Sequence, residues 1–354
     1  AALKAQGKRV HRIQIDYPCH SPQMAALVPE LVSRMGTVQC GPCAIPMVST
    51  VHGQLLPGES LTAAYWAENM QRPMAVVAAT AALASEGVRI VEIGPHAVAL
   101  RGIEETLRAS SYKGTRVLAA GYRDQPGRRT LEDLACALFC DGFDVRWDVV
   151  LGRAEGGGVW SSVPLLLSGR SQAALRENAR RLAAHLDAHP ELRAVDIART
   201  LAACRKHFEH RAAIVAPSRA EALAALGCVA EGRDHHAACV DRALEEGELA
   251  VLFTGQGSQR LGMGRELYDA LPVFRQALDQ VCDALDVHLP RPLRSVLFAA
   301  SDAPEASLLD QTQYTQPALF AFEVALFRQW QAWGLAPDFV AGHSVGELSA
   351  AHVA

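Results

Sequence analysis

One serine in this sequence has neighbours that favour nucleophilic chemistry. Ser344 is flanked by Gly342 and Gly346 in a G-x-S-x-G pattern, after an apolar run at 339–341 and before a helix-forming run at 348–351. The pattern predicts a buried strand, a tight turn that requires small residues, and then a helix. Such a nucleophile elbow lifts a hydroxyl clear of a sheet, and the first helical N–H groups face a developing negative charge. The five-residue pattern alone also occurs by chance.

A second glycine-rich turn precedes the serine in the chain. The apolar run 249–253 predicts a buried strand, and it continues into Gly255-Gln256-Gly257, a turn expected to expose backbone N–H groups. Between the two turns we expect a helix that opens near Thr315 as its cap, with Pro317 in the first turn. Its apolar residues share one face, and Gly334 ends it. Those residues are Leu319, Phe322, Leu326 and Trp330.

A serine hydroxyl needs a neighbouring base at neutral pH, and imidazole is the suitable group. His20 follows an alternating segment, residues 9–17, which predicts a half-buried strand that stops at Pro18. A helix is expected to follow, with Ser21 as its cap, Pro22 at its first position, and Leu27 and Leu31 on its inner face. A histidine at such a junction can point into a cleft, although a single histidine is more often structural.

Composition excludes several classes of function. The chain has 354 residues, half of them apolar, and a net charge of −4, which gives no electrostatic reason to bind nucleic acid. No apolar run approaches the roughly 18 residues of a membrane span, and the first residues lack the apolar core of a signal peptide. The nine cysteines show no regular spacing, which favours free thiols in a reducing compartment. We therefore expect a soluble, cytoplasmic protein without a membrane partner.

No metal site is predicted. Cys40 and Cys43 form a single C-x-x-C pair without a second pair nearby, and a zinc site needs four ligands. His235, His236 and Cys239 lie in a polar segment that we expect to be solvated.

The middle of the chain predicts a separate small unit. Residues 152–163 are rich in glycine and form the most linker-like run. After it come two predicted strands, 163–167 and 211–216, with helices that start after the caps Ser171 and Ser218. Before it, a helix is expected to begin at Thr130 in a capping box with Asp133. The small α/β unit offers no nucleophile with a base beside it.

Several motifs together resemble one enzyme family. GQGSQ (255–259), TQPALFAFE (315–323) and GHSVGE (342–347) occur in the order seen in the opening half of malonyl-CoA-type acyltransferase domains of modular polyketide and fatty acid synthases. YPCHSPQM (17–24), IPMVST (45–50), YWAEN (65–69) and VEIGPH (91–96) resemble the closing half of the same domain. The middle unit resembles the linker domain that precedes such an acyltransferase.

The resemblance implies a fold and a chemistry. The fold is α/β: partial α/β-hydrolase-like acyltransferase halves, with part of a ferredoxin-like subdomain, flank the small α/β linker module. Ser344 would be the nucleophile and His20 the base, oriented by a backbone carbonyl, while the N–H groups of Gln256 and Val345 stabilise the oxyanion. The acyl group would come from an acyl-CoA and leave on the phosphopantetheine thiol of an acyl carrier protein. No bound cofactor is implied, and ketosynthase domains are expected neighbours.

The two halves appear in reverse order, which allows two organisations. The chain is either a slice through a synthase or one circularly permuted domain, and the abrupt ends and the middle module favour the slice. The predicted parts are the closing half of one acyltransferase (1–110), a trailing segment (111–151), a linker (152–163), the linker module (164–247) and the opening half of a second acyltransferase (248–354). In a slice, Ser344 and His20 belong to different active sites.

Acyl-group selectivity is expected to involve His343, Val345, Tyr17 and Cys19. The aliphatic Val345 after the nucleophile resembles malonyl-selective relatives, whereas Tyr17 in YPCH does not favour plain malonyl. The two halves are therefore expected to load different acyl groups. Two other classes stay open: a thioesterase or esterase, which would need an acid and a histidine after Ser344, and an inert scaffold fragment.

Overall fold

The computed structural model describes residue 6 and residues 18–84, 87–109, 114–152, 160, 162–245 and 247–354. The strand predicted for residues 9–17 therefore lies outside the described residues, as does most of the linker predicted for 152–163.

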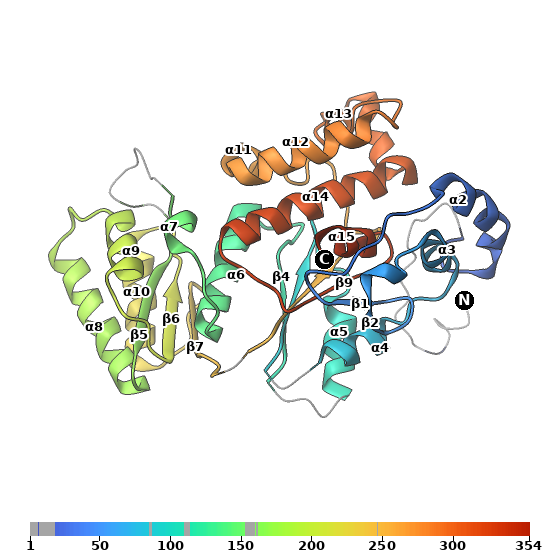
Figure 1. The fold of residues 1–354 in the computed structure, drawn as a ribbon. Helices are drawn as coiled ribbons and strands as arrows, with labels where there is room; N and C mark the ends of the chain where they lie inside the picture. Colours follow the sequence, from blue (N-terminus) through green and yellow to red (C-terminus); the bar gives the residue numbers. More distant parts are fainter. Residues whose placement is uncertain are drawn as a thin grey trace.

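A six-stranded sheet forms the centre of the larger unit, with the strand order β2-β1-β9-β8-β3-β4. Figure 1 shows segments from both ends of the chain in this one sheet. Its strands are β1 (Met47–Ser49), β2 (Gln54–Leu56), β3 (Arg89–Ile93), β4 (Arg116–Ala119), β8 (Leu249–Phe253) and β9 (Phe339–Gly342). All neighbours are parallel except β1 and β2.

The pairing of strands joins the two halves of the chain. β9 pairs with β1, with Val340 opposite Met47, and β8 pairs with β3 over five residues from Leu249 opposite Arg89. The slice hypothesis expected each half to belong to a separate domain. In this structure the halves instead complete one sheet, while their pairing within a longer synthase stays a prediction.

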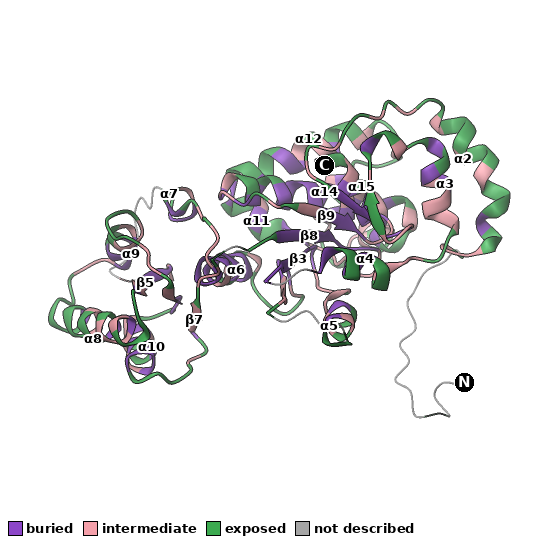
Figure 2. Ribbon diagram, turned by 60° about the horizontal axis from the view of Figure 1, so that its bottom comes forward, coloured by how far each residue is buried: buried purple, intermediate pink, exposed green. Residues whose placement is uncertain are grey.

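The inner strands β1, β9, β8 and β3 are largely buried, as expected for parallel strands covered by helices, whereas the edge strand β2 is mostly exposed and β4 is half-buried. All five residues of β3 and of β8 are buried, and Figure 2 shows the sheet as the buried layer between the helices. On one face α4 (Val76–Leu83) and α5 (Leu100–Ala109) pack against Ile90, Ala250 and Ala341. On the other face α6 (Gly127–Asp141), α14 (Thr312–Ala332) and α15 (Gly346–Val353) share a core with Val251, Phe253 and Val340.

Further helices complete this unit. The chain enters through η1 (Pro22–Leu27), α2 (Val28–Met35), η2 (Gly58–Ser60) and α3 (Ala63–Gln71). Outside α14 lie α11 (Arg265–Ala270), α12 (Pro272–Asp286), α13 (Leu293–Leu297) and η3 (Pro304–Asp310).

A three-stranded antiparallel sheet forms the small unit, in the order β5-β6-β7. Its elements are β5 (Leu165–Gly169), β6 (His210–Ile214), β7 (Ala238–Arg242), α8 (Gln172–Ala188), α9 (Ala194–Ala203) and α10 (Arg219–Glu231), after the short α7 (Trp147–Val150). The predicted caps are confirmed, since Ser171 accepts from the Ala174 N–H and Ser218 from the Glu221 N–H. The third strand, β7, was missed because its residues are polar or half-exposed.

Two other predictions at helix starts are wrong. α14 begins at Thr312 and α6 at Gly127, so Thr315 and Thr130 lie inside the helices rather than at their caps. Ser21 is at the N-cap of η1 and Pro22 at its first position, as predicted, but the Ser21 side chain makes no cap hydrogen bond and donates to the carbonyl of Pro18 over 2.7 Å. Leu27, expected on an inner face, is exposed.

The α/β class is confirmed, and α6 joins the two units. It packs against β6 and β7 of the small sheet, and its apolar side chains belong to one continuous core that contains residues of both sheets. In Figure 1, α6 stands between the two sheets.

Candidate active site

The elbow predicted around Ser344 is present in the structure. β9 ends at Gly342, Ser344 adopts a left-handed φ of 59°, and α15 begins at Gly346. A side chain at Gly342 would overlap the backbone of Gly346, and one at Gly346 would overlap the carbonyls of Phe253 and Thr254. The glycines are therefore required because the turn brings three backbone segments into contact.

His20 lies against this elbow. Its Nε2 is 2.7 Å from Oγ of Ser344, and its Nδ1 is 3.3 Å from the carbonyl oxygen of Arg72. Its backbone N–H donates to the carbonyl of Met70 over 2.9 Å. An Nδ1–H that donates to a carbonyl leaves the Nε2 lone pair facing the serine hydroxyl, which is the arrangement of a general base.

Both residues have an unusual backbone. Among the described residues, His20, with a φ of 54°, and Ser344 are the only non-glycine residues with positive φ. This region costs energy for residues with a Cβ, and it persists where surrounding structure enforces it, often at functional sites. The two strained residues contact each other across the junction of the two chain halves. The expectation that they belong to different sites therefore does not describe this structure.

Burial keeps the imidazole in its neutral form. It lowers the pKa of His20, against the opposing effect of hydrogen bonds to the carbonyls of Arg72 and Asn69. The pKa of His343 is also lowered, first by burial and then by the proximity of His20. A neutral imidazole at neutral pH is able to accept a proton from the serine.

The glycine-rich turn after β8 lies beside the elbow. The N–H of His343 donates to the carbonyl of Phe253 over 2.9 Å, and a side chain at Gly255 would overlap the ring of His343. Gly257 has a φ of 116°, and its N–H donates to Oε1 of Gln259. Gln256 and Val345, whose N–H groups were expected to stabilise an oxyanion, thus belong to two turns in contact.

Comparison with known proteins supports the same assignment. Residues 1–145 and 251–354, more than half of the chain, match the family described as Acyl transferase domain. The chain belongs to this acyl transferase domain family. Residues 164–226, in the small unit, match the family described as CurL-like, PKS C-terminal. The family predicted from the sequence motifs is confirmed.

Several relatives are polyketide synthases. Polyketide synthase GfsA of Streptomyces halstedii is 51% identical over 192 residues, which are 54% of this chain and 3% of that protein. The phenolphthiocerol synthesis polyketide synthase type I Pks15/1 of Mycobacterium marinum is 52% identical over 192 residues, 54% of this chain and 9% of that protein. The chain thus spans less than a tenth of these relatives.

A solved structure shows the same fold over about half of the chain. The acyltransferase domain from module 8 of the salinomycin polyketide synthase is 36% identical with a TM-score of 0.50. The match covers 55% of this chain and 46% of that structure.

Two buried carboxyl groups of this acyl transferase domain flank the elbow, and sequence reasoning missed both. Glu347 on α15 accepts a hydrogen bond from the hydroxyl of Tyr65, and Glu323 on α14 lies within hydrogen-bond distance of Ser349. Each is a single acid in a run of apolar or small residues. That pattern was the only sign in the sequence that these carboxyl groups would be buried. Burial raises the pKa of both side chains.

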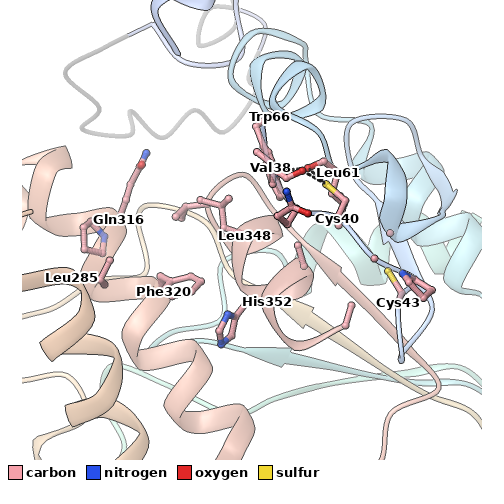
Figure 3. Close-up of a pocket in the computed structure, with 18 residues that line it drawn as sticks. Val38, Cys40, Cys43, Leu61, Trp66, Leu285, Gln316, Phe320, Leu348 and His352 are labelled. Carbon is pink, nitrogen blue, oxygen red and sulfur yellow. Dashed lines mark hydrogen bonds between the residues drawn. The ribbon is translucent and has the colours of Figure 1, made fainter. Parts of the chain in front are cut away.

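An apolar cavity of about 730 Å³ lies beside the elbow helix. Figure 3 shows Phe320 of α14 with Leu348 and His352 of α15 on one side, and Cys40 and Leu61 on the other. Val345, expected to affect selectivity, lines this cavity. Cys40 donates from Sγ to the carbonyl of Leu61 over 3.2 Å.

The remaining predicted residues are placed as follows. Cys19, half-buried, directly precedes His20, whereas Tyr17 lies outside the described residues. In the part of the chain that is described, no cluster of three or more His, Cys, Asp or Glu side chains could hold a metal ion. No helix within the described ranges is long and apolar enough to span a membrane.

Proposed function

We propose that this chain carries out acyl transfer from an acyl-CoA to the phosphopantetheine thiol of an acyl carrier protein, through an acyl ester on Ser344. The observation that carries the proposal is the 2.7 Å contact between Oγ of Ser344 and Nε2 of His20, with Nδ1 directed at the Arg72 carbonyl. A hydroxyl beside a fixed, neutral imidazole is the arrangement of an activated nucleophile.

In the first half-reaction Oγ of Ser344 attacks the thioester carbon while its proton passes to Nε2 of His20. The carbonyl oxygen becomes an oxyanion that the N–H groups of Gln256 and Val345 stabilise. Loss of one such donor typically lowers turnover by about 10²–10³. When the intermediate collapses, the C–S bond breaks and Nε2–H returns the proton to the sulfur of coenzyme A.

The second half-reaction reverses these steps with a different thiol. Nε2 of His20 takes the proton of the phosphopantetheine thiol, and the sulfur of that thiol attacks the carbonyl carbon of the acyl-serine. The C–O bond to Ser344 then breaks, and the proton passes to Oγ. The contact of Nδ1 with a carbonyl agrees with a histidine that is oriented by the backbone.

We propose malonyl-type groups as substrates. Val345 is aliphatic, as in malonyl-selective relatives, and it lines the cavity beside the elbow together with Leu348. His343 and Cys19 are adjacent to the reacting pair in sequence. The rates of acylation by malonyl-CoA and by methylmalonyl-CoA, compared in wild type and Val345→Gln, test this part. We expect the ratio of the two rates to shift toward methylmalonyl-CoA in the variant. An unchanged ratio would show that Val345 does not determine acyl-group selectivity.

We further propose that the small unit, residues 164–247, is a linker module that orients the acyltransferase next to a ketosynthase. Its support is the family match over residues 164–226 and the position of α6, which contacts the small sheet on one side and α11 of the larger unit on the other. In a longer synthase each half would pair with the missing half of its own acyltransferase domain, as the reversed order of the motifs suggests.

Acylation and transfer are measured separately. Purified chain is mixed with malonyl-CoA, and the acyl adduct is located by mass spectrometry, with Ser344→Ala as control. A carrier protein bearing phosphopantetheine is then added. We expect an adduct on Ser344 that moves to the carrier thiol. Release of free acid without transfer would favour a thioesterase, and absence of an adduct in wild type would overturn the proposal.

A further inference from the structure

Glu347 accepts hydrogen bonds from several donors at the junction of the two chain halves. Its side chain lies on α15, three residues after Ser344, and is fully buried. Oε1 accepts from the backbone N–H of Thr50 over 2.8 Å and from the hydroxyl of Tyr65 over 2.6 Å. Oε2 accepts from Nδ2 of Asn69 and lies 3.3 Å from the hydroxyl oxygen of Thr50.

Every one of these partners comes from the half of the chain that contains His20. Thr50 is 297 residues from Glu347 in sequence, and Asn69 is 278 residues away. Thr50 also donates from its hydroxyl to the carbonyl of Gly342 over 2.6 Å, so it contacts the elbow on both sides of Ser344. The carboxylate thereby connects the serine-bearing turn to β1 and α3.

The element that Glu347 contacts is also the one that contacts His20. Tyr65 and Asn69 lie on α3, and the end of this helix supplies the Met70 carbonyl for the His20 N–H. Arg72, the next residue but one, supplies the carbonyl near Nδ1. A closed path therefore runs from Ser344 through Glu347 and α3 to His20, and back across the 2.7 Å contact.

We propose that Glu347 is a positioning residue that fixes the distance and angle between His20 and Ser344. The proposal rests on the function proposed above. Three of these groups, the Thr50 N–H, the Tyr65 hydroxyl and Nδ2 of Asn69, donate to the side chain of Glu347, and a carboxylate offers an acceptor oxygen to each of them. In Glu347→Gln the side-chain NH₂ group would face other donors. The buried donors would lose their acceptor, and α3 would be displaced from the elbow.

Movement of α3 has a chemical consequence at His20. A displacement of about 1 Å between nucleophile and base lowers a rate by about 10². The same movement would expose the His20 imidazole to water. Its pKa, which burial lowers in the wild type, should then rise. His343 of the elbow is the titratable group next to His20 in both cases. A loss of stability alone would not move this pKa.

The test compares three variants of the full chain. Glu347→Gln removes the carboxylate, and Tyr65→Phe removes one donor to it. Tyr268→Phe is the matched control, because it also removes a phenol that donates to a carboxylate, Asp279, outside this cluster. Thermal melting of each variant verifies folding, and Tyr65→Phe decides the question if Glu347→Gln does not fold.

Two readouts are measured for each variant. One is the single-turnover rate of acylation by malonyl-CoA. The other is the titration of the His20 imidazole by NMR, assigned with His20→Ala. We expect Glu347→Gln to lower the rate about 10²-fold with KM unchanged, and to shift the His20 titration up toward its ordinary midpoint near ~6.5. Tyr65→Phe should change both in the same direction by less, and Tyr268→Phe should change neither.

The outcomes separate the two proposals. A folded Glu347→Gln or Tyr65→Phe with a wild-type rate and a wild-type His20 titration would overturn the positioning role. Failure of wild type to be acylated would overturn the proposed function instead, and the NMR titration would still decide whether Glu347 controls the environment of His20.

Discussion

Oε1 of Glu323 lies 2.6 Å from the hydroxyl of Thr254, the residue that joins β8 to the GQG turn. Oε2 of the same carboxyl lies 2.7 Å from the hydroxyl of Ser349 on the elbow helix. One fully buried side chain of α14 thus connects the two turns that hold Gln256 and Val345. Burial raises the pKa of Glu323 to about 8, although the hydrogen bonds oppose this shift. The carboxyl is therefore protonated at neutral pH.

This protonation predicts a pH dependence of stability. An unfolded glutamate has a pKa of about 4.3, so between that value and about 8 the folded chain holds a proton that the unfolded chain has released. The free energy of unfolding must then fall as pH rises through this window. Glu323→Gln removes the titration and retains one donor and one acceptor, so the variant should gain stability relative to wild type as pH rises.

Urea unfolding from about pH 5 to about pH 8 tests this prediction. Glu105→Gln on α5 is the control, because its exposed carboxylate contacts only a neighbouring helical side chain, Arg101, in the described structure. We expect its difference from wild type to stay flat with pH. Parallel curves for wild type and Glu323→Gln would contradict the buried, protonated state.

The low pKa of His20 predicts the pH profile of acylation. Because burial lowers this pKa, the neutral base persists below the ordinary imidazole value of about 6.5. The single-turnover rate should rise with pH as His20 loses its proton and then level off, and the midpoint of this rise should lie below that value. His20→Ala should lower the plateau by about 10²–10⁴ and remove the dependence.

His288→Ala is the control for this profile, since His288 is an exposed histidine on the surface. It should leave the rate and its midpoint unchanged. A wild-type midpoint above the ordinary imidazole value, or a profile that survives in His20→Ala, would assign the titration to another group.

Local patterns allowed the elbow to be predicted, whereas the pairing of Ser344 with His20 depends on tertiary contacts. Glycines on both sides of a serine after an apolar run determine a turn within a few residues. The meeting of the serine and the histidine requires β9 to pair with β1 and β8 with β3. Nothing within either segment encodes that pairing, and the order of the motifs favoured separate domains.

The errors at helix starts have a common physical cause. A threonine resembles a cap in sequence, but inside a helix its hydroxyl also donates to the carbonyl four residues earlier. The hydroxyl of Thr130 donates to the carbonyl of Pro126 over 3.0 Å, and the hydroxyl of Thr315 lies 2.6 Å from the carbonyl of Leu309 and 3.1 Å from that of Gln311. The burial of Glu323 and Glu347 likewise depends on neighbours distant in sequence, so a single acid in an apolar run could not be assigned.

The close approach at the elbow predicts opposite effects for two glycine substitutions. A Cβ at Gly346 would overlap the carbonyls of Phe253 and Thr254, whereas one at Gly102 on α5 meets nothing within 4 Å. Gly346→Ala should lower the free energy of unfolding by about 1–3 kcal/mol, as overpacking does, and should impair acylation. Gly102→Ala should raise it by about 0.5–1 kcal/mol without an effect on acylation. Urea unfolding and single-turnover acylation measure both, and equal stabilities would contradict the described turn.

The buried ion pair at the opposite edge of the sheet predicts a large loss of stability when it is broken. Asp141, with a fully buried side chain, accepts from Nε of Arg89 over 2.6 Å and from Arg116 over 2.9 Å. Arg116 also contacts Asp241 of β7 over 2.7 Å, which connects the two sheets. Asp141→Asn leaves a buried guanidinium without its counter-charge and should cost about 3–5 kcal/mol in urea unfolding.

Asp241→Asn removes the exposed partner of the same arginine, so it should cost much less, because solvent screens the remaining charge. The arginine partners of both residues lie at the start of β3 and β4, whereas Ser344 follows the end of β9, and parallel strands place these ends at opposite edges. The pH midpoint of acylation should therefore be unchanged in every variant that folds. Equal losses of stability in the two variants would show that burial does not govern the strength of this pair.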